Sequence, residues 1–236
     1  MLRMADLKSD ETRNILGTIP LFDGLTATEL NWVAHQAHRR MVAAGTSIVT
    51  AELPGEAVYI ILYGTVKIHV EQADGRDVVL AILGAGDTVG EMSLIDSSGR
   101  SASAVTLEDS LLLWMDKQAF QEALRQFPAV AQSLVRILSA RVRLANELIQ
   151  ALATLDVYGR VARQVLAFAE KYGRADGESV LIPIHLTQSD IADLVGASRK
   201  RVNTVMVFFR EQEFISINAN GKIVVLNRAG LAKYCK

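Results

Sequence analysis

The stretch LTQSDIADLVGASRKRVNTVMVFFREQEFI, Leu186–Ile215, decides the fold of the C-terminal part of the chain. Thr187, with Asp190 three residues later, is typical of a capping box at a helix start, and Gly196 permits a sharp turn. Ser198 can cap a second helix, so the spacing predicts a helix-turn-helix. The second helix has these inward apolar positions: Val202, Val205, Met206 and Phe209.

The segment after this motif, FISINANGKIVVLN, alternates in strand fashion around Asn220-Gly221, which indicates a type I′ hairpin. A helix-turn-helix followed by a hairpin predicts a winged helix. Its outward polar side chains predict a DNA-reading surface, because arginine reads guanine in the major groove. The candidate DNA-binding residues are Thr187, Gln188, Ser198, Arg199, Lys200, Arg201 and Thr204.

Charge also distinguishes the two ends of the chain. Residues 1–156 carry 13 Lys/Arg against 19 Asp/Glu, whereas residues 157–236 carry 12 against 7. An acidic part joined to a basic part indicates that only the C-terminal part meets a polyanion. The alternative is chance clustering of surface charge.

The first half has the pattern of an antiparallel β domain. Eight of the sixteen glycines lie between Gly45 and Gly99, and they separate short runs such as AVYIILYG and DVVLAIL. Asp74-Gly75 indicates a hairpin turn, and TATELNWVAHQ predicts a preceding helix capped by Thr26 or Thr28. The expected class is α+β, with an N-terminal β-roll or jelly roll, a long helix and a winged helix-turn-helix.

Residues 128–156 lack glycine and predict one long helix with two apolar stripes. Two stripes need two partners, and we expect the N-terminal domain to cover one and a second subunit the other. The alternative is a helix buried on both sides within one chain. The predicted dimer face is Leu134, Leu138, Val142, Ala145, Ile149 and Leu152.

The segment GEMSLIDSSGRSASA, Gly90–Ala104, places a glutamate and an arginine in one short stretch. With the helix-turn-helix, it resembles the Crp/Fnr superfamily of bacterial transcription regulators, over about residues 19–227. The resemblance implies that Arg100 and Ser101 bind a cyclic phosphate and that Glu91 accepts from the ribose 2′-hydroxyl. It places Gly90 and Met92 in the same site. The alternative is that Glu91 and Arg100 form a surface ion pair.

The resemblance also implies cyclic AMP as the allosteric effector, with no other cofactor. Where cyclic-AMP-binding members contact the base with a Thr-Ser pair, this chain has Ala145 and Asn146. A regulator that is ligand-independent, or that senses another molecule, is therefore the alternative. Arg199 corresponds to a guanine-reading arginine of the family, whereas Lys200 and Thr204 replace a base-reading glutamate and arginine.

The expected organisation is a sensor domain over 1–127, a dimerisation helix over 128–156 and a DNA-binding domain over 157–236. The expected partners are double-stranded DNA, a cyclic nucleotide, a second subunit and, for an activator, RNA polymerase. A charged N-terminus and a single cysteine, Cys235, favour a cytoplasmic protein without a membrane span.

Other chemistries lack the residues they need. One cysteine excludes an iron–sulfur cluster bound by this chain. His69 is the one candidate haem ligand in the predicted barrel, and a solvated strand residue is its simpler interpretation. His35 and His38 lack a nearby third metal ligand. A phosphodiesterase would need a metal cluster or an activated nucleophile, so we expect neither an enzyme nor a metal site.

Overall fold

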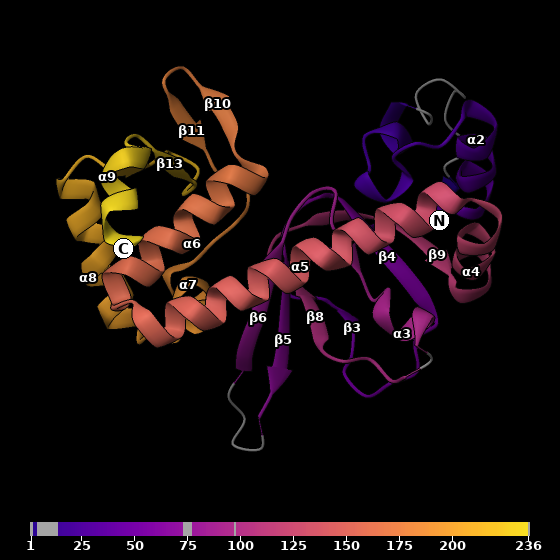
Figure 1. The fold of residues 1–236 in the computed structure, drawn as a ribbon, viewed down its shortest axis with the longest axis horizontal. Helices are drawn as coiled ribbons and strands as arrows, with labels where there is room; N and C mark the ends of the chain where they lie inside the picture. The colour runs from indigo at the N-terminus through magenta and orange to yellow at the C-terminus, as the bar shows by residue number, and fades with distance from the viewer. Residues whose placement is uncertain (1, 4–13, 73–76, 97, 236) are drawn as a thin grey trace. The chain divides into compact units, whose positions relative to one another are not determined.

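The computed structural model describes residues 2–3, 14–72, 77–96 and 98–235. The chain divides into two compact units, residues 1–71 with 81–142 and residues 72–80 with 143–236. Most of the first unit is indigo to magenta in Figure 1, and most of the second is orange to yellow. The helix α5 (Pro128–Thr154) contributes residues to both.

The N-terminal sensor fold consists of two antiparallel sheets, as predicted. Their strand orders are β1-β2-β9-β4-β7 and β3-β8-β5-β6. The predicted turn at Asp74-Gly75 lies outside the described residues. The strands are β1 (Leu2–Arg3), β2 (His38–Val42), β3 (Ser47–Val49), β4 (Ala57–Tyr63), β5 (Val66–Glu71), β6 (Asp77–Leu83), β7 (Thr88–Val89), β8 (Ser103–Thr106) and β9 (Ser110–Asp116).

Two apolar cores hold the first unit together. One lies between the sheets and joins residues such as Ile61 and Leu112 of the first sheet to Ala104 of the second. The other packs the opposite face of the first sheet against helices and includes Leu113 and Phe120. The helical elements of the first unit include the 3-10 turn η2 (Pro20–Phe22), α2 (Ala27–Gln36), α3 (Met92–Ile95), α4 (Lys117–Gln126) and the start of α5. Thr26 caps α2 in a capping box.

Residues 157–235, within the second unit, form a winged helix-turn-helix, as predicted. Its strands form one sheet in the order β10-β11-β13-β12. Its elements are α6 (Val157–Tyr172), β10 (Arg174–Asp176), β11 (Ser179–Leu181), α7 (Gln188–Leu194), α8 (Arg199–Glu211), β12 (Ile215–Ile217), β13 (Ile223–Val225), α9 (Arg228–Ala232) and the 3-10 turn η3 (Lys233–Cys235).

The hairpin between β12 and β13 corrects one prediction. A type I′ turn needs a positive φ at both central residues, but Gly221 has one (+72°) and Asn220 does not. The N–H of Gly221 donates to the carbonyl of Asn218, and the N–H of Asn218 donates to the carbonyl of Lys222. The loop therefore has three residues, with the glycine in the left-handed position.

Candidate functional site

The turn at Gly90 and Glu91 connects β7 to the short helix α3. Gly90 has a φ of +85°, which glycine adopts without the strain that a side chain would bring. A Cβ at this position would also collide with Nη1 of Arg100. The glycine therefore allows the guanidinium group to reach the backbone of the turn.

Glu91 is buried, with 1% of its surface exposed. Its Oε1 accepts a hydrogen bond from Nη1 of Arg141 at 2.6 Å. Nη2 of Arg141 donates to the carbonyl oxygen of Thr88 at 2.5 Å and to its Oγ1 at 3.0 Å. Oε2 of Glu91 is buried without a hydrogen-bond partner among the described residues. A buried acceptor without a partner costs free energy, so Oε2 of Glu91 has unused capacity to accept a hydrogen bond.

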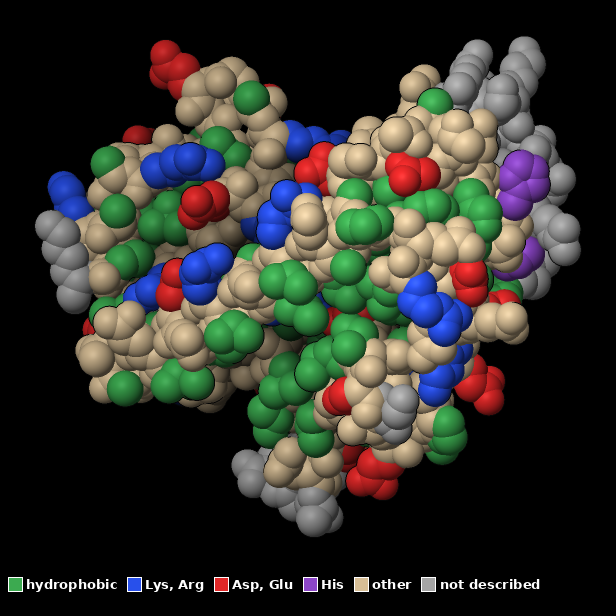
Figure 2. Space-filling model, turned by 45° about the vertical axis from the view of Figure 1, so that its right-hand side comes forward, with side chains coloured by type: hydrophobic (Ala, Val, Ile, Leu, Met, Phe, Trp, Pro, Cys, Tyr) green, Lys and Arg blue, Asp and Glu red, His purple; other side chains and the backbone are tan. Residues whose placement is uncertain are grey.

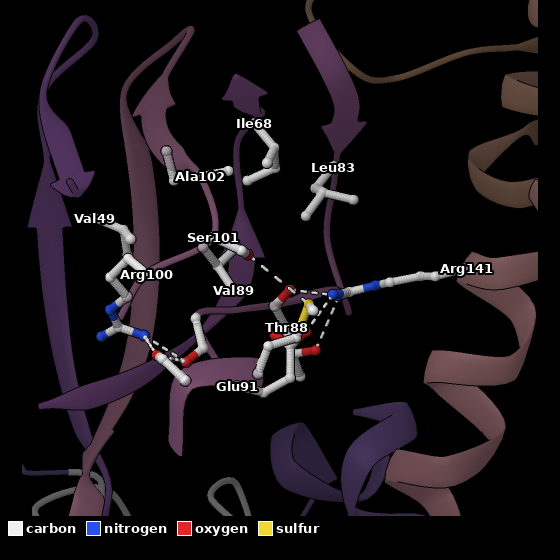
Figure 3. Close-up of a pocket in the computed structure, with 14 residues that line it drawn as sticks. Val49, Ile68, Leu83, Thr88, Val89, Glu91, Arg100, Ser101, Ala102 and Arg141 are labelled. Atoms are coloured by element: carbon white, nitrogen blue, oxygen red, sulfur yellow. Dashed lines mark hydrogen bonds and ion pairs between the residues drawn. The ribbon is translucent and has the colours of Figure 1, made fainter. Parts of the chain in front are cut away.

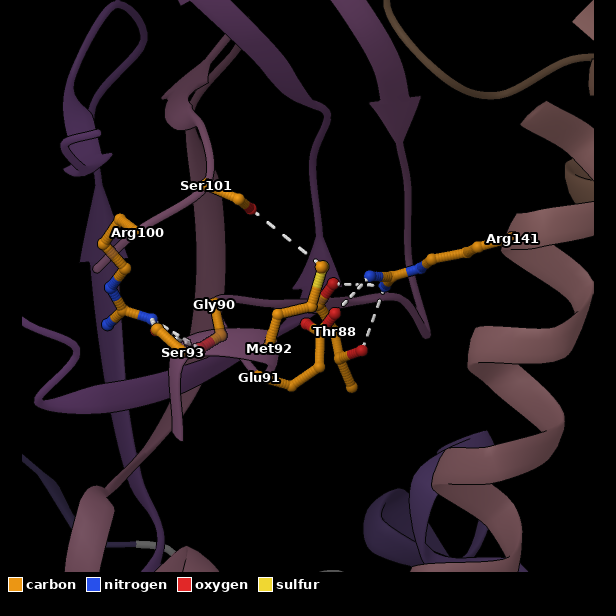
Figure 4. Close-up of polar contacts among 8 residues, drawn as sticks. All are labelled: Thr88, Gly90, Glu91, Met92, Ser93, Arg100, Ser101 and Arg141. Atoms are coloured by element: carbon orange, nitrogen blue, oxygen red, sulfur yellow. Dashed lines mark hydrogen bonds and ion pairs between the residues drawn. The ribbon is translucent and has the colours of Figure 1, made fainter. Parts of the chain in front are cut away.

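Arg100 approaches the same turn from the side opposite Arg141 (Figure 4). It is 8% exposed, and burial lowers the pKa of its guanidinium group, opposed by Tyr59 and by Glu91. Nη1 donates to the Gly90 carbonyl and to Oγ of Ser93. Nη2 donates to the carbonyl of Ala57 at 2.7 Å.

The surface-ion-pair interpretation of Glu91 and Arg100 is therefore wrong. Both side chains are buried. In the contacts of Figure 4, Glu91 pairs with Arg141, and Arg100 bonds to the carbonyl of Gly90 and to Ser93. The two groups instead line one cavity.

That cavity has a volume of about 80 Å³ and brings together five of the predicted ligand-binding residues, Gly90, Glu91, Met92, Arg100 and Ser101. Figure 3 shows Glu91, Arg100 and Ser101 of this set, with the apolar strand residues Ile68 and Leu83 above them. Ser101 is exposed, and its Oγ lies 4.0 Å from the sulfur of Met92. The cavity thus has one charged, polar end and one apolar end.

The helix-turn-helix presents its predicted DNA-binding residues as expected from local structure. Thr187 and Asp190 form a capping box at α7, and Ser198 caps α8. Gly196 has a φ of +61° in the turn. Gln188 is half-buried, and the polar residues of α8 are exposed: Arg199, Lys200, Arg201 and Thr204. Thr204 donates to the carbonyl of Lys200 at 3.1 Å.

Comparison with known proteins agrees with both parts of the chain described above, the domain that holds the cavity and the helix-turn-helix. Residues 39–127 match the model of the cyclic nucleotide-binding domain, and residues 159–234 match that of the Crp-like helix-turn-helix domain. The chain is 33% identical over 213 residues to the "CRP-like cAMP-activated global transcriptional regulator" of Mycobacterium tuberculosis, covering 90% of this chain and 94% of the relative. The chain belongs to the Crp/Fnr family of transcription regulators.

Two further relatives of this Crp/Fnr regulator extend the comparison. It is 31% identical over 198 residues to the "Cyclic AMP receptor protein" of Thermus thermophilus, covering 84% of this chain and 88% of the relative. The structure of FixK2 from Bradyrhizobium japonicum matches with a TM-score of 0.74 and 21% identity, covering 85% of this chain and 98% of that one. That similarity is one of fold.

The sequence analysis missed Thr88, Ser93 and Arg141 of this site, and Arg141 is the charged one. It stands three residues after Leu138 and seven after Leu134, so it continues the stripe of α5 that packs on the sensor core. A charged residue in an apolar stripe is a signal of a buried partner. Ala145 and Asn146, in contrast, are exposed on α5 and do not line the cavity.

The predicted dimer face of this Crp/Fnr regulator needs one correction. Leu134 is 5% exposed and belongs to the sensor core, and Leu138 is half-buried against that core. Farther along α5, apolar side chains are exposed, and hydrophobic side chains are also visible at the surface in Figure 2. The exposed residues of the predicted face are Val142 (59%), Ala145, Ile149 (65%) and Leu152 (45%).

Within the described residues, no group of three or more His, Cys, Asp or Glu side chains is placed to hold a metal ion. The helices of the described part of the chain include none long and apolar enough to cross a membrane.

Proposed function

We propose that the first unit of this regulator binds cyclic AMP in the cavity around Glu91 and that binding controls DNA recognition by α8. The observation that carries the proposal is that a carboxylate and two guanidinium groups line a single cavity. A cyclic nucleotide offers the matching groups, a ribose hydroxyl that donates and a phosphate that accepts. The names of the relatives from M. tuberculosis and T. thermophilus, both of which refer to cyclic AMP, support the same ligand.

At the sugar end, Oε2 of Glu91 accepts a hydrogen bond from the ribose 2′-hydroxyl. A carboxylate repels a phosphate, so Glu91 sets the direction in which the nucleotide enters. The hydroxyl also supplies the hydrogen bond that buried Oε2 lacks among the described residues. Since a carboxylate bond is charge-assisted, it is worth more than a neutral one.

At the phosphate end, Arg100 and Ser101 bind the cyclic phosphate. Arg100 already donates to the carbonyls of Gly90 and Ala57. The phosphate must therefore compete with these internal hydrogen bonds. The binding free energy is the difference between the hydrogen bonds that Arg100 makes to the phosphate and those that it makes to the two carbonyls. The bonds to the phosphate are stronger because the phosphate carries a full charge.

Arg141 gives this site a physical connection to α5. It bonds Glu91 and Thr88 from the helix. A ligand that bonds Glu91 changes the interaction free energy of this contact, and so it shifts the preferred position of α5. That is the first step by which ligand binding acts on the dimer and the recognition helices.

The base end favours a second candidate. Ala145 and Asn146 replace the Thr-Ser pair that the family resemblance associates with adenine. Alanine offers no hydrogen bond, whereas an asparagine amide both donates and accepts. A regulator that senses another molecule, or that binds DNA without an effector, is the function to set against cyclic AMP.

We also propose that the active form is a homodimer paired through α5 and bound to a palindromic operator. The exposed stripe Val142, Ala145, Ile149 and Leu152 would supply the seam. Two recognition helices related by a two-fold axis read half-sites about one helical turn apart. Arg199 specifies a guanine, whereas Lys200 has only donors and cannot accept from cytosine.

Calorimetry of the full chain against cyclic AMP and cyclic GMP tests the effector. We expect saturable binding, tighter for cyclic AMP, and tighter binding to a DNA site selected from a random library when cyclic AMP is present. Absence of binding to either nucleotide, with effector-independent DNA binding, would overturn the cyclic AMP proposal and favour the second candidate.

A further inference from the structure

The C-terminal residues fold back onto the DNA-binding unit. α9 and η3, yellow in Figure 1, lie against α6. The ring of Tyr234 in η3 stands with its centroid 5.4 to 6.3 Å from those of four other aromatic rings. We call these five residues the ring cluster: Tyr158, Phe208, Phe209, Phe214 and Tyr234.

The ring cluster joins the two helices that matter for orientation. Tyr158 lies in the first turn of α6, two residues after its cap Asp156, and its ring stacks on that of Tyr234 at an interplanar angle of 26°. Phe208 and Phe209 lie near the end of α8, and the Tyr234 ring meets both edge to face. Tyr158 also meets Phe208 and Phe209 directly, edge to face. Because such aromatic pairs have preferred geometries, Tyr234 adds a third ring that contacts both helices and restrains the end of α8 against α6.

Two glycines bring the segment this close. A Cβ at Gly159 of α6 would lie 2.6 Å from the carbonyl oxygen of Tyr234. A Cβ at Gly230 of α9 would lie 2.6 Å from the ring of Phe214. Neither distance is available to a real Cβ, so the segment packs directly on the backbone of α6 at Gly159, and the Phe214 ring packs directly on the backbone of α9 at Gly230.

The far end of α8 carries the DNA-reading residues. Arg199 begins the helix, and Phe209 lies ten residues later, which is about 15 Å at 1.5 Å per residue. Since a helix moves as one body over this length, a change of tilt at Phe209 displaces the Arg199 side chain from its base. Hydrogen bonds to base edges tolerate little displacement.

We propose that Tyr234 is a positioning residue for DNA recognition: its ring holds the recognition helix at the angle that sequence-specific contact requires. This inference rests on the proposed reading of DNA by α8. It assigns the effect to the ring and not to the hydroxyl. Tyr234 acts through α8 and touches no DNA itself.

The test compares full-length Tyr234→Ala, Tyr234→Leu and Tyr234→Phe with Tyr172→Ala, whose ring packs on Phe168 at the other end of α6. Fluorescence anisotropy gives the Kd for an operator selected with the wild-type protein and for a random duplex of equal length, at one salt concentration. We expect Tyr234→Ala and Tyr234→Leu to weaken operator binding about tenfold, the loss of roughly one specific base contact. Random-duplex binding, which depends on charge, should not change.

The outcomes separate this inference from the proposed function. Tyr234→Phe should bind the operator within about twofold of the wild type, as should Tyr172→Ala. If the ratio of operator Kd to random-duplex Kd is unchanged in Tyr234→Leu, whether or not both affinities fall, the positioning role is overturned. Tyr234→Leu keeps apolar bulk and decides the matter if Tyr234→Ala does not fold. A wild-type protein that selects no operator would instead overturn sequence-specific reading by α8.

Discussion

The sensor cavity and the helix-turn-helix differ in how the chain builds them. In the helix-turn-helix, each feature is fixed by residues three or four apart, such as Thr187 with Asp190 or Ser198 with Arg201. In the sensor, Arg100 bonds Ala57 and Glu91 bonds Arg141, across 43 and 50 residues of sequence. A DNA-reading surface can thus be prepared locally, whereas the ligand site exists only when the whole domain has folded.

The largest expected effect is on dimer formation through α5, the helix that contributes residues to both units. Val142→Glu with Ile149→Glu places carboxylates on two exposed apolar positions of the proposed seam. An unpaired charge buried at an interface costs roughly 3 to 5 kcal/mol, so we expect a monomer in sedimentation experiments. Arg125→Glu, at an exposed position of α4, is the control. A wild-type monomer, or an undisturbed dimer in the double variant, would contradict the proposed pairing.

The next largest effect is on ligand binding and concerns the sensor cavity alone. Arg100→Leu removes the charge partner of the cyclic phosphate, a loss of roughly 2 to 5 kcal/mol in binding free energy for a buried pair. It also leaves the carbonyls of Gly90 and Ala57 short of a donor, so unfolding should require less denaturant. Calorimetry with cyclic AMP and urea unfolding measure the two effects. Arg136→Leu, whose arginine pairs with exposed Asp23, should preserve binding.

These two regions also differ in how well sequence predicts them. The helix caps, the glycine in the turn and the exposed polar face of the helix-turn-helix all follow from local rules, and the sequence predicts each of them. Arg141 was missed because its partners Glu91 and Thr88 come from strands and turns that no local pattern relates to α5. Leu134 was placed on the dimer face because periodicity identifies a stripe but not which neighbour covers it.

The wing hairpin shows a limit of local rules themselves. Asn220-Gly221 predicted a two-residue turn, but Oδ1 of Asn218 accepts from the N–H groups of Asn220 and Lys222 at 3.0 and 2.9 Å. This side-chain bond favours a longer loop. An asparagine two residues before the Asn-Gly pair was the signal that the prediction left out.

A smaller effect is expected on operator binding by the helix-turn-helix. Arg199→Ala should cost about 1 to 3 kcal/mol in operator binding and relax selectivity at one guanine in each half-site. Cyclic AMP affinity should not change, because Arg199 lies outside the sensor cavity. Lys200→Glu should shift preference toward a cytosine-containing site, since glutamate accepts where lysine donates. Selection from a random DNA library measures both, and unchanged consensus sequences would show that neither residue reads bases.

The smallest effect is on the free energy of unfolding. It tests, in both regions, the rule that glycine is favoured where φ is positive. Among the described residues, two non-glycine residues have a positive φ, Glu52 (+68°) beside Arg100 in the sensor and Glu213 (+56°) after α8. The left-handed conformation costs a side-chain-bearing residue roughly 1 to 2 kcal/mol, while glycine adds about 0.5 to 1 kcal/mol of chain entropy to the unfolded state.

We therefore expect Glu213→Gly to stabilise the protein by about 0.5 to 1 kcal/mol in urea unfolding. The N–H of Glu213 donates to the carbonyl of Arg210 in a helix-ending turn that glycine favours. Glu52→Gly should gain less, because the N–H of Glu52 donates to the Arg100 carbonyl and this long-range contact between two loops holds the backbone in place. Arg201→Gly, within α8, should instead destabilise by about 0.5 to 1 kcal/mol. Equal gains at Glu52 and Glu213 would show that the sensor loop obeys local rules as fully as the helix-turn-helix does.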